Sequence, residues 1–218
     1  MTDFELFARD HHVSSHLLND YEKKTNSMFI EPTVIEERTS NMVQLSVFSR
    51  LFMDRILFLG TEINSDVANI INSQILFLAM EDPKKPISIY INSPGGSCVD
   101  GLSIYDVFKY VSCPIHTTCM GMSASMGAVL LSSGEKGGRS ALNHGKVMIH
   151  EPIGGVYGKA TDFEISYQEI MKYKETLSRI LAENTGKSYE EIVEACKIDK
   201  WFTAQEAMDF GLIDNINQ

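Results

Sequence analysis

The chain has 218 residues, 44% of them hydrophobic and 22% charged, which suits one globular domain with a substantial core. Its formal net charge of -10 argues against a nucleic-acid-binding protein, because binding phosphates needs clustered Lys and Arg, whereas 19 scattered basic residues here face 29 acidic ones. No apolar run approaches the roughly 18–20 residues that a membrane-spanning helix requires.

The first part of the chain predicts little regular structure. Residues 1–27 are mostly polar and read as a tail, in which His11, His12 and His16 could form a metal site on one helical turn, although nothing nearby completes the ligand set. From Met28 to Thr39 the apolar residues around a proline predict an extended arm that could dock elsewhere.

Helices and strands then alternate, which predicts a parallel α/β sheet. In chain order we expect a helix near Val43–Met53, a strand at Ile56–Leu59, a helix from the cap candidates Asn64, Ser65 and Asp66 to Pro83, a strand at Ile87–Ile91, a turn at Asn92–Gly96, a helix at Val99–Val111, a strand at Ile115–Cys119 and a helix starting at Ser125–Leu131.

The last third changes character after a glycine-rich break at Gly134–Gly138. A strand is expected at Val147–Ile149, and Phe163–Glu183 predicts a long, projecting helix because its polar and apolar residues alternate at helical spacing. Two shorter helices are expected at Tyr189–Cys196 and Ala204–Phe210, the second ended by Gly211 as a left-handed cap.

The cysteines and the start of the chain favour a reducing, cytoplasmic setting. Neither CxxC pairs nor the spacing of metal ligands occurs among the four cysteines, which are Cys98, Cys113, Cys119 and Cys196. The first residues also lack the basic and then apolar pattern of a signal peptide. We therefore expect free thiols and no bound metal.

Two segments that follow predicted strands could carry chemistry, because the carboxyl ends of parallel strands collect active groups. In Gly121–Ala128 the small residues suit a sharp strand-to-helix turn that exposes a serine, and Ser125 fits this turn better than Ser123. The alternative is a helix start packed closely on the sheet. In Ser93–Gly96 two glycines could aim N–H groups at an oxyanion, or could form an ordinary tight turn.

A serine nucleophile needs a base, and a carboxylate to orient that base. His150 closes the predicted strand at the same edge as Ser125, whereas His144 precedes that strand and His116 lies inside another, so His150 is preferred. Spacing cannot choose among 29 carboxylates; Asp199 is notable only because it comes just before the apolar pair Trp201-Phe202, which would anchor it.

Taken together, these segments resemble the family of Clp protease proteolytic subunits, from about Met28 to the C-terminus. The matching segments are Ser49-Arg50-Leu51, Arg55-Ile56, Tyr90–Gly96, Ser103–Asp106, Ala124–Ala128, Met148–Pro152 with Gly154-Gly155, Glu206-Ala207 and Gly211–Asp214.

The resemblance implies the site. Carried over residue by residue, it makes Ser125 the nucleophile, His150 the base and Asp199 the orienting acid, with the N–H groups of Gly96 and Met126 as the oxyanion hole. It also implies that apolar surface between subunits receives loops of a partner, for which Tyr90 is a candidate.

The resemblance also implies an architecture. We expect a crotonase-like α/β fold in which a spiral βαβ core at 48–218 carries a protruding α/β handle at about 154–183. Residues 28–47 would be an N-terminal arm or axial loop, and residues 1–27 a propeptide or disordered tail. Two stacked seven-membered rings would give fourteen subunits enclosing the active sites.

The implied partner is a hexameric AAA+ ATPase unfoldase of the Clp type, which threads unfolded protein substrates into the chamber. This chain has no ATP-binding motif, so it should need no cofactor, and the ATP would be used by the partner.

One departure and two alternatives remain. Family members often carry an acid and an arginine that form ring-to-ring ion pairs where this chain has Lys197-Ile198, so altered ring pairing is expected. The chain could instead be a structural or catalytically dependent subunit of a mixed ring, or a crotonase-type acyl-CoA enzyme.

Overall fold

The computed structural model describes residues 33–38, 41–155 and 158–217. They belong to two compact units, one ending at Arg50 and the other beginning at Leu51. The predicted tail, its three histidines and residues 28–32 lie outside the described residues.

The first unit contains a β-hairpin in place of the simple arm that the sequence predicts. Strand β1 (Thr33–Arg38) pairs antiparallel with β2 (Asn41–Ser46). The helix predicted from Val43 is therefore wrong at its start: α3 spans Val47–Met53, because the backbone before it is engaged in the hairpin.

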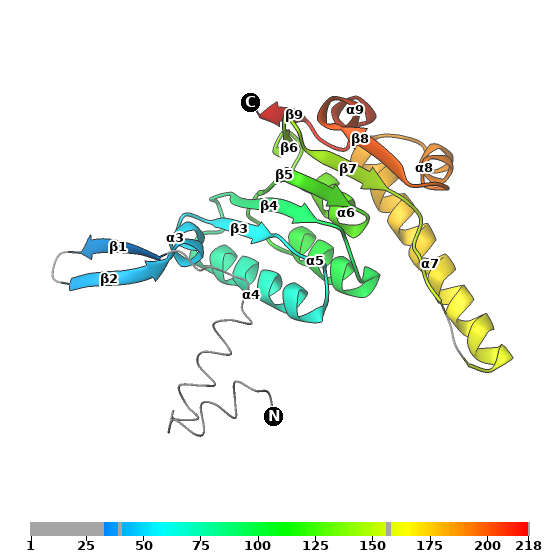
Figure 1. The fold of residues 1–218 in the computed structure, drawn as a ribbon, viewed down its shortest axis with the longest axis horizontal. Coiled ribbons are helices and arrows are strands. Elements are labelled where there is room, and N and C mark those ends of the chain that lie inside the picture. The colour runs from blue at the N-terminus through cyan, green and yellow to red at the C-terminus, as the bar shows by residue number, and fades with distance from the viewer. Residues whose placement is uncertain (1–32, 39–40, 156–157, 218) are drawn as a thin grey trace, which may run out of the picture. The chain divides into compact units, whose positions relative to one another are not determined.

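The second unit is built on a mostly parallel seven-stranded sheet (Figure 1). Its main path runs, in spatial order, through β3 (Ile56–Leu59), β4 (Ile87–Ser93), β5 (Ile115–Ala124), β6 (Arg139–Leu142) and β9 (Asn215–Asn217). Off this path, β7 (Lys146–Ile149) pairs parallel with β5, and β8 (Lys200–Thr203) pairs antiparallel with β7.

Strand β5 is the point where the sheet divides. Its first part, Thr117–Cys119, pairs with β6, and its last part, Met122–Ala124, pairs with β7. Between them Gly121 has a φ of 91°, and the Met122 N–H donates to Asn92 Oδ1 at 3.2 Å. The expected end of this strand at Cys119 is therefore wrong, because a second partner strand extends it.

Among the described residues of the second unit, six helices follow or flank these strands. They are α4 (Ser65–Glu81), α5 (Cys98–Tyr110), α6 (Met126–Ser132), α7 (Ala160–Thr185), α8 (Tyr189–Ala195) and α9 (Ala204–Phe210). Two predicted signals are confirmed: Asn64 Oδ1 accepts the Val67 N–H at 3.0 Å to begin α4, and Gly211, at a φ of 94°, ends α9.

The helix α7 runs past the edge of the sheet, as the sequence predicts (Figure 1). Its C-terminal half is held by buried apolar side chains such as Leu177 and Leu181, whereas Phe163 and Ile165 near its start are exposed. In the described part of the predicted handle, α7 is the regular element, and residues 151–155 and 158–159 adopt no strand.

A buried ion pair joins the far end of the sheet to the ends of two helices. Arg139 is 2% exposed and donates to both carboxylate oxygens of Asp214, at 2.9 and 2.5 Å. The same guanidinium donates to the carbonyls of Ser132 in α6, at 3.2 Å, and of Asn184 in α7, at 2.8 Å. The buried charge is therefore neutralised by Asp214 and hydrogen-bonded on several sides.

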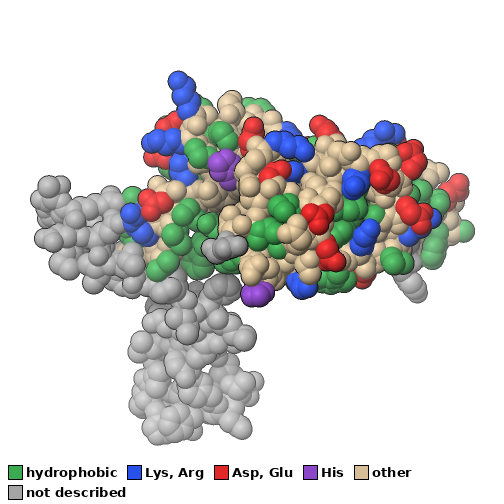
Figure 2. Space-filling view, turned by 90° about the horizontal axis from the view of Figure 1, so that it is seen from above, with side chains coloured by type: hydrophobic (Ala, Val, Ile, Leu, Met, Phe, Trp, Pro, Cys, Tyr) green, Lys and Arg blue, Asp and Glu red, His purple; other side chains and the backbone are tan. Residues whose placement is uncertain are grey.

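The surface charges are mixed. On the face that Figure 2 shows, Lys and Arg side chains lie among Asp and Glu side chains. Within the described ranges, no helix is both long and apolar enough to cross a membrane.

Candidate active site

Ser125 lies at the sharp turn between β5 and α6. Its φ of 55° and ψ of -123° are strained for a residue with a Cβ, and such strain is typical of a nucleophile held on a strand-to-helix elbow. The turn is fixed on both sides, because the Ser125 N–H donates to the Met148 carbonyl at 2.9 Å and its own carbonyl accepts from Ala128 at 2.9 Å.

A chain of hydrogen bonds joins Ser125, His150 and Asp199. His150 Nε2 lies 2.9 Å from Ser125 Oγ, and His150 Nδ1 lies 3.1 Å from Asp199 Oδ1. The imidazole is 14% exposed, whereas the Asp199 side chain is 64% exposed. With its proton on Nδ1, the imidazole donates to Asp199 and can accept the serine proton.

The pairing of β7 with β8 brings the histidine and the aspartate together. Ile149 in β7 is the register partner of Lys200 in β8, so the next residue of one strand, His150, lies beside the preceding residue of the other, Asp199. The predicted apolar anchor is half right, since Phe202 is 4% exposed and Trp201 is 52% exposed.

The turn after β4 lies against the elbow. A Cβ at Gly95 would lie 2.6 Å from the Cβ of Ser125 and 3.0 Å from the Met126 nitrogen, so a backbone without a side chain is required there. Gly96 is held by an isolated parallel bridge to Ile63. The glycine turn thus lies beside Ser125 and the Met126 amide while being held by a separate element.

A family model for Clp proteases matches residues 38–218. The chain belongs to the Clp protease family. Three bacterial proteins named "ATP-dependent Clp protease proteolytic subunit" are similar to it over 216–217 residues, which is 99% of this chain. They come from Porphyromonas gingivalis (48% identical, 97% of that protein covered), Bacteroides fragilis (47%, 98%) and Bacteroides thetaiotaomicron (46%, 98%).

Membership confirms the predicted fold class, since the Clp protease family accounts for the α/β core and its mostly parallel sheet. It also confirms that this Clp protease chain is an enzyme, a peptidase of the serine type.

His144 and His116 of this Clp protease lie where the sequence predicts, whereas Ser123, expected in the turn, lies in the extended part of β5. Ser123 is completely buried in β5, with 0% exposure, and so cannot reach a substrate. His144 is exposed in the turn before β7, at the opposite end of that strand from His150, and His116 is half-buried within β5.

The thiols do not compete with Ser125 as nucleophiles. Burial raises the pKa of Cys196, next to the site, to about 11, and burial also raises the pKa of Cys98 and of Cys119. A thiol is nucleophilic as the thiolate, so burial lowers the reactivity of these three groups near neutral pH. Among the described residues, no group of His, Cys, Asp and Glu is arranged to hold a metal ion.

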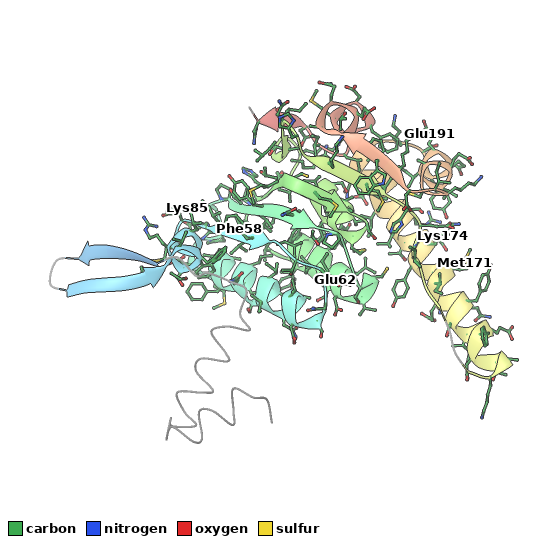
Figure 3. All side chains as sticks on the ribbon, viewed as in Figure 1. Phe58, Glu62, Lys85, Met171, Lys174 and Glu191 are labelled. Atoms are coloured by element: carbon green, nitrogen blue, oxygen red, sulfur yellow. The ribbon has the colours of Figure 1, made fainter. Side chains whose placement is uncertain are left out.

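The backbone around His150 is held by contacts of Glu151 that could not be predicted from the sequence. The next residue, Glu151, donates its N–H to the Cys196 carbonyl at 2.9 Å, and its carboxylate lies 2.5 Å from Lys174 Nζ. The hydrogen bond to Glu151 raises the pKa of Lys174, which lies midway along α7 (Figure 3). No spacing rule pairs residues 23 positions apart, so the sequence carries no signal for this contact.

Tyr90 lies away from the triad, on β4. Its ring stacks on that of Phe58 in β3, with centroids 5.5 Å apart, because the two residues are register partners. Tyr90 is half-buried, so part of the ring is accessible.

Proposed function

We propose that this chain is an endopeptidase subunit in which Ser125 is the nucleophile, His150 the general base and Asp199 the group that orients it. The observation that carries this proposal is the continuous hydrogen-bond chain from Ser125 Oγ through His150 to Asp199. The strained backbone at Ser125 supports it independently, because strain of this kind is kept where it serves a reaction.

The reaction proceeds through an acyl-enzyme. Ser125 Oγ attacks the carbonyl carbon of the peptide bond while its proton passes to His150 Nε2. Asp199 accepts the hydrogen bond from His150 Nδ1–H throughout the reaction and stabilises the imidazolium. The C–N bond then breaks as His150 protonates the leaving amine. His150 Nε2 then deprotonates a water that attacks the ester carbon, the C–O bond to Ser125 breaks, and His150 returns the proton to Ser125 Oγ.

The negative charge that forms on the substrate oxygen needs donors. We assign this role to the N–H groups of Gly96 and Met126, the second being the residue after the nucleophile at the start of α6. Both belong to backbone held by neighbouring elements, so they can donate without reorganising during the reaction.

The proposed setting is a chamber of two stacked seven-membered rings, fed with unfolded proteins by a hexameric AAA+ ATPase unfoldase. The printed names of the relatives, ATP-dependent proteolytic subunits, support an ATPase partner. In this proposal ATP is the partner's cofactor and this chain needs none. Tyr90 would receive the partner's loops, and the free thiols support a cytoplasmic location.

A fluorophosphonate probe tests the assigned nucleophile. We expect the purified protein to gain one phosphonyl group per chain, and peptide mapping to locate it on Ser125. The matched control is Ser123→Ala, which should label to the same extent because Ser123 is buried. A protein that stays unlabelled would instead support the structural-subunit or acyl-CoA alternatives.

Native mass spectrometry tests the assembly. We expect a fourteen-subunit mass, with each chain shortened by removal of residues up to about Ser27. A smaller assembly would indicate that Lys197-Ile198 weakens ring pairing, or that a second type of subunit is needed. A fourteen-subunit assembly of uncut chains would contradict the proposed propeptide.

A further inference from the structure

Ser93, the last residue of β4, is completely buried and uses its hydroxyl in two directions. The O–H donates to the Thr61 carbonyl at 2.6 Å, and the oxygen accepts the Gly95 N–H at 3.1 Å. The hydroxyl therefore ties the glycine turn to the loop between β3 and α4, which Glu62 marks in Figure 3.

The other face of the same turn is held by Ile63. Its N–H donates to the Gly95 carbonyl at 2.8 Å, and its own carbonyl accepts the Ser97 N–H at 2.9 Å. A trans peptide unit is planar, so its C=O and N–H groups point in opposite directions. With the Gly95 carbonyl directed at Ile63, the Gly96 N–H of the same unit points away from Ile63.

The direction of the Gly96 N–H thus depends on two hydrogen bonds at Gly95, one made by its N–H and one made by its carbonyl. Both glycines have left-handed backbone angles, with φ of 94° at Gly95 and 147° at Gly96. Glycine has many accessible conformations, so the peptide units of this turn rotate easily once one of these hydrogen bonds is lost. The Ser93 hydroxyl oxygen accepts the hydrogen bond from the Gly95 N–H.

We propose that Ser93 is a positioning residue for peptide-bond hydrolysis: its hydroxyl fixes Gly95 and so aims the Gly96 N–H at the developing oxyanion. This inference rests on the proposed oxyanion role of Gly96. Without the hydroxyl, the Gly95 N–H and the Thr61 carbonyl lose their common partner, and the turn gains freedom where the reaction needs a fixed donor.

The chain provides a matched control on the neighbouring strand. Ser123 in β5 is the register partner of Ser93, and both are 0% exposed. Their hydroxyls differ in what they hold, because the Ser93 hydroxyl bonds Gly95 and Thr61, whereas the Ser123 hydroxyl makes no bond to the turn and acts on the Cys119 thiol. Replacing either serine by alanine removes one buried oxygen from the same region, but only Ser93→Ala releases the turn.

The experiment measures kcat and KM of the full-length assembled protein on a short fluorogenic peptide. Complete loss of an oxyanion donor costs roughly 100–1,000-fold in kcat, so a loosened donor in Ser93→Ala should cost about 10–100-fold, with KM within about twofold. Ser123→Ala should stay within about twofold in both. If Ser93 had only a structural role, kcat and KM would change to the same extent in Ser93→Ala and Ser123→Ala.

Two further measurements keep the outcome decisive. Ser93→Ala should still take up one fluorophosphonate per chain at completion, since its nucleophile is intact. Ser93→Cys, which fills similar space with a weaker donor and acceptor, should lose several-fold in kcat and serves alone if Ser93→Ala does not fold. The proposal is overturned if either folded Ser93 variant matches Ser123→Ala.

Failure of this proposal can be distinguished from failure of the proposed function. If wild-type protein is labelled at Ser125 and active, but Ser93→Ala behaves like Ser123→Ala, only the role of Ser93 is lost. If the wild type is not labelled at Ser125, the catalytic assignment itself is lost.

Discussion

Replacing Ser125 by alanine should lower kcat for a short peptide substrate by a factor on the order of 10⁶, leaving only the residual effect of binding and the oxyanion donors. The reason is that Ser125 Oγ is the atom that forms the acyl-enzyme and lies 2.9 Å from the proposed base. Steady-state hydrolysis by wild type and variant, at equal concentrations of assembled protein, measures the loss.

The control for this change is again Ser123→Ala, which removes a serine from the same strand-to-helix segment without touching the hydrogen-bond chain. It should hydrolyse the peptide at nearly the wild-type rate. Retention of substantial activity by Ser125→Ala, with no contaminating peptidase present, would falsify the assignment of the nucleophile.

Replacing Asp214 by alanine should lower the free energy of unfolding by about 3–5 kcal/mol, because it leaves a buried guanidinium without its counter-ion. Arg139 is 2% exposed and cannot turn to solvent without disrupting its bonds to Ser132 and Asn184. The shift in the midpoint of urea unfolding, at equal protein concentrations, gives the effect. The matched control is Glu194→Ala, which removes the partner of exposed Lys197 and should cost less than about 1 kcal/mol.

The contribution of Asp214 should also depend on pH. Partial burial raises the pKa of Asp214, but the hydrogen bonds from Arg139 and Gly137 outweigh it and hold the pKa below its ordinary value. A carboxylate with a lowered folded-state pKa stabilises the fold above its unfolded pKa of about 3.9, and this contribution is lost as the pH falls through the folded-state value. Wild type and Asp214→Ala should therefore converge in stability below about pH 4; a constant difference down to pH 2 would contradict the argument.

The longer elements of this fold could be predicted from the sequence because their signals are local. Asn64 caps the start of α4 and Gly211 ends α9, so a residue in the local sequence marks one end of each helix. The strands β6, β8 and β9 could not be predicted. The equally short β3 and β7 contain apolar runs, whereas these three strands mix polar and apolar residues and their pairing comes from distant segments. The extension of β5 was missed for the same reason.

The residues of the candidate site also fall into those that local sequence marks and those that depend on distant segments. Ser125 and His150 follow strands of one parallel sheet, so reasoning about strand ends finds both. Asp199 precedes an antiparallel strand that was not predicted, so its apolar neighbours only drew attention to it and the family resemblance was needed to choose it. The Ser93 hydroxyl and the Glu151–Lys174 ion pair act between elements far apart in sequence, and no local pattern marks them.

The pairing of Ile149 with Lys200 has a consequence for how such chains can change in length. Between these two residues the chain leaves the sheet, passes through α7 and α8 and returns to the register position that it left. The entropy of closing an excursion grows slowly with its length, by about 0.6 kcal/mol for each doubling. Turns can therefore be gained or lost at the projecting end of α7 while His150 and Asp199 stay in contact, so the reach of the helix and the chemistry of the site can diverge independently.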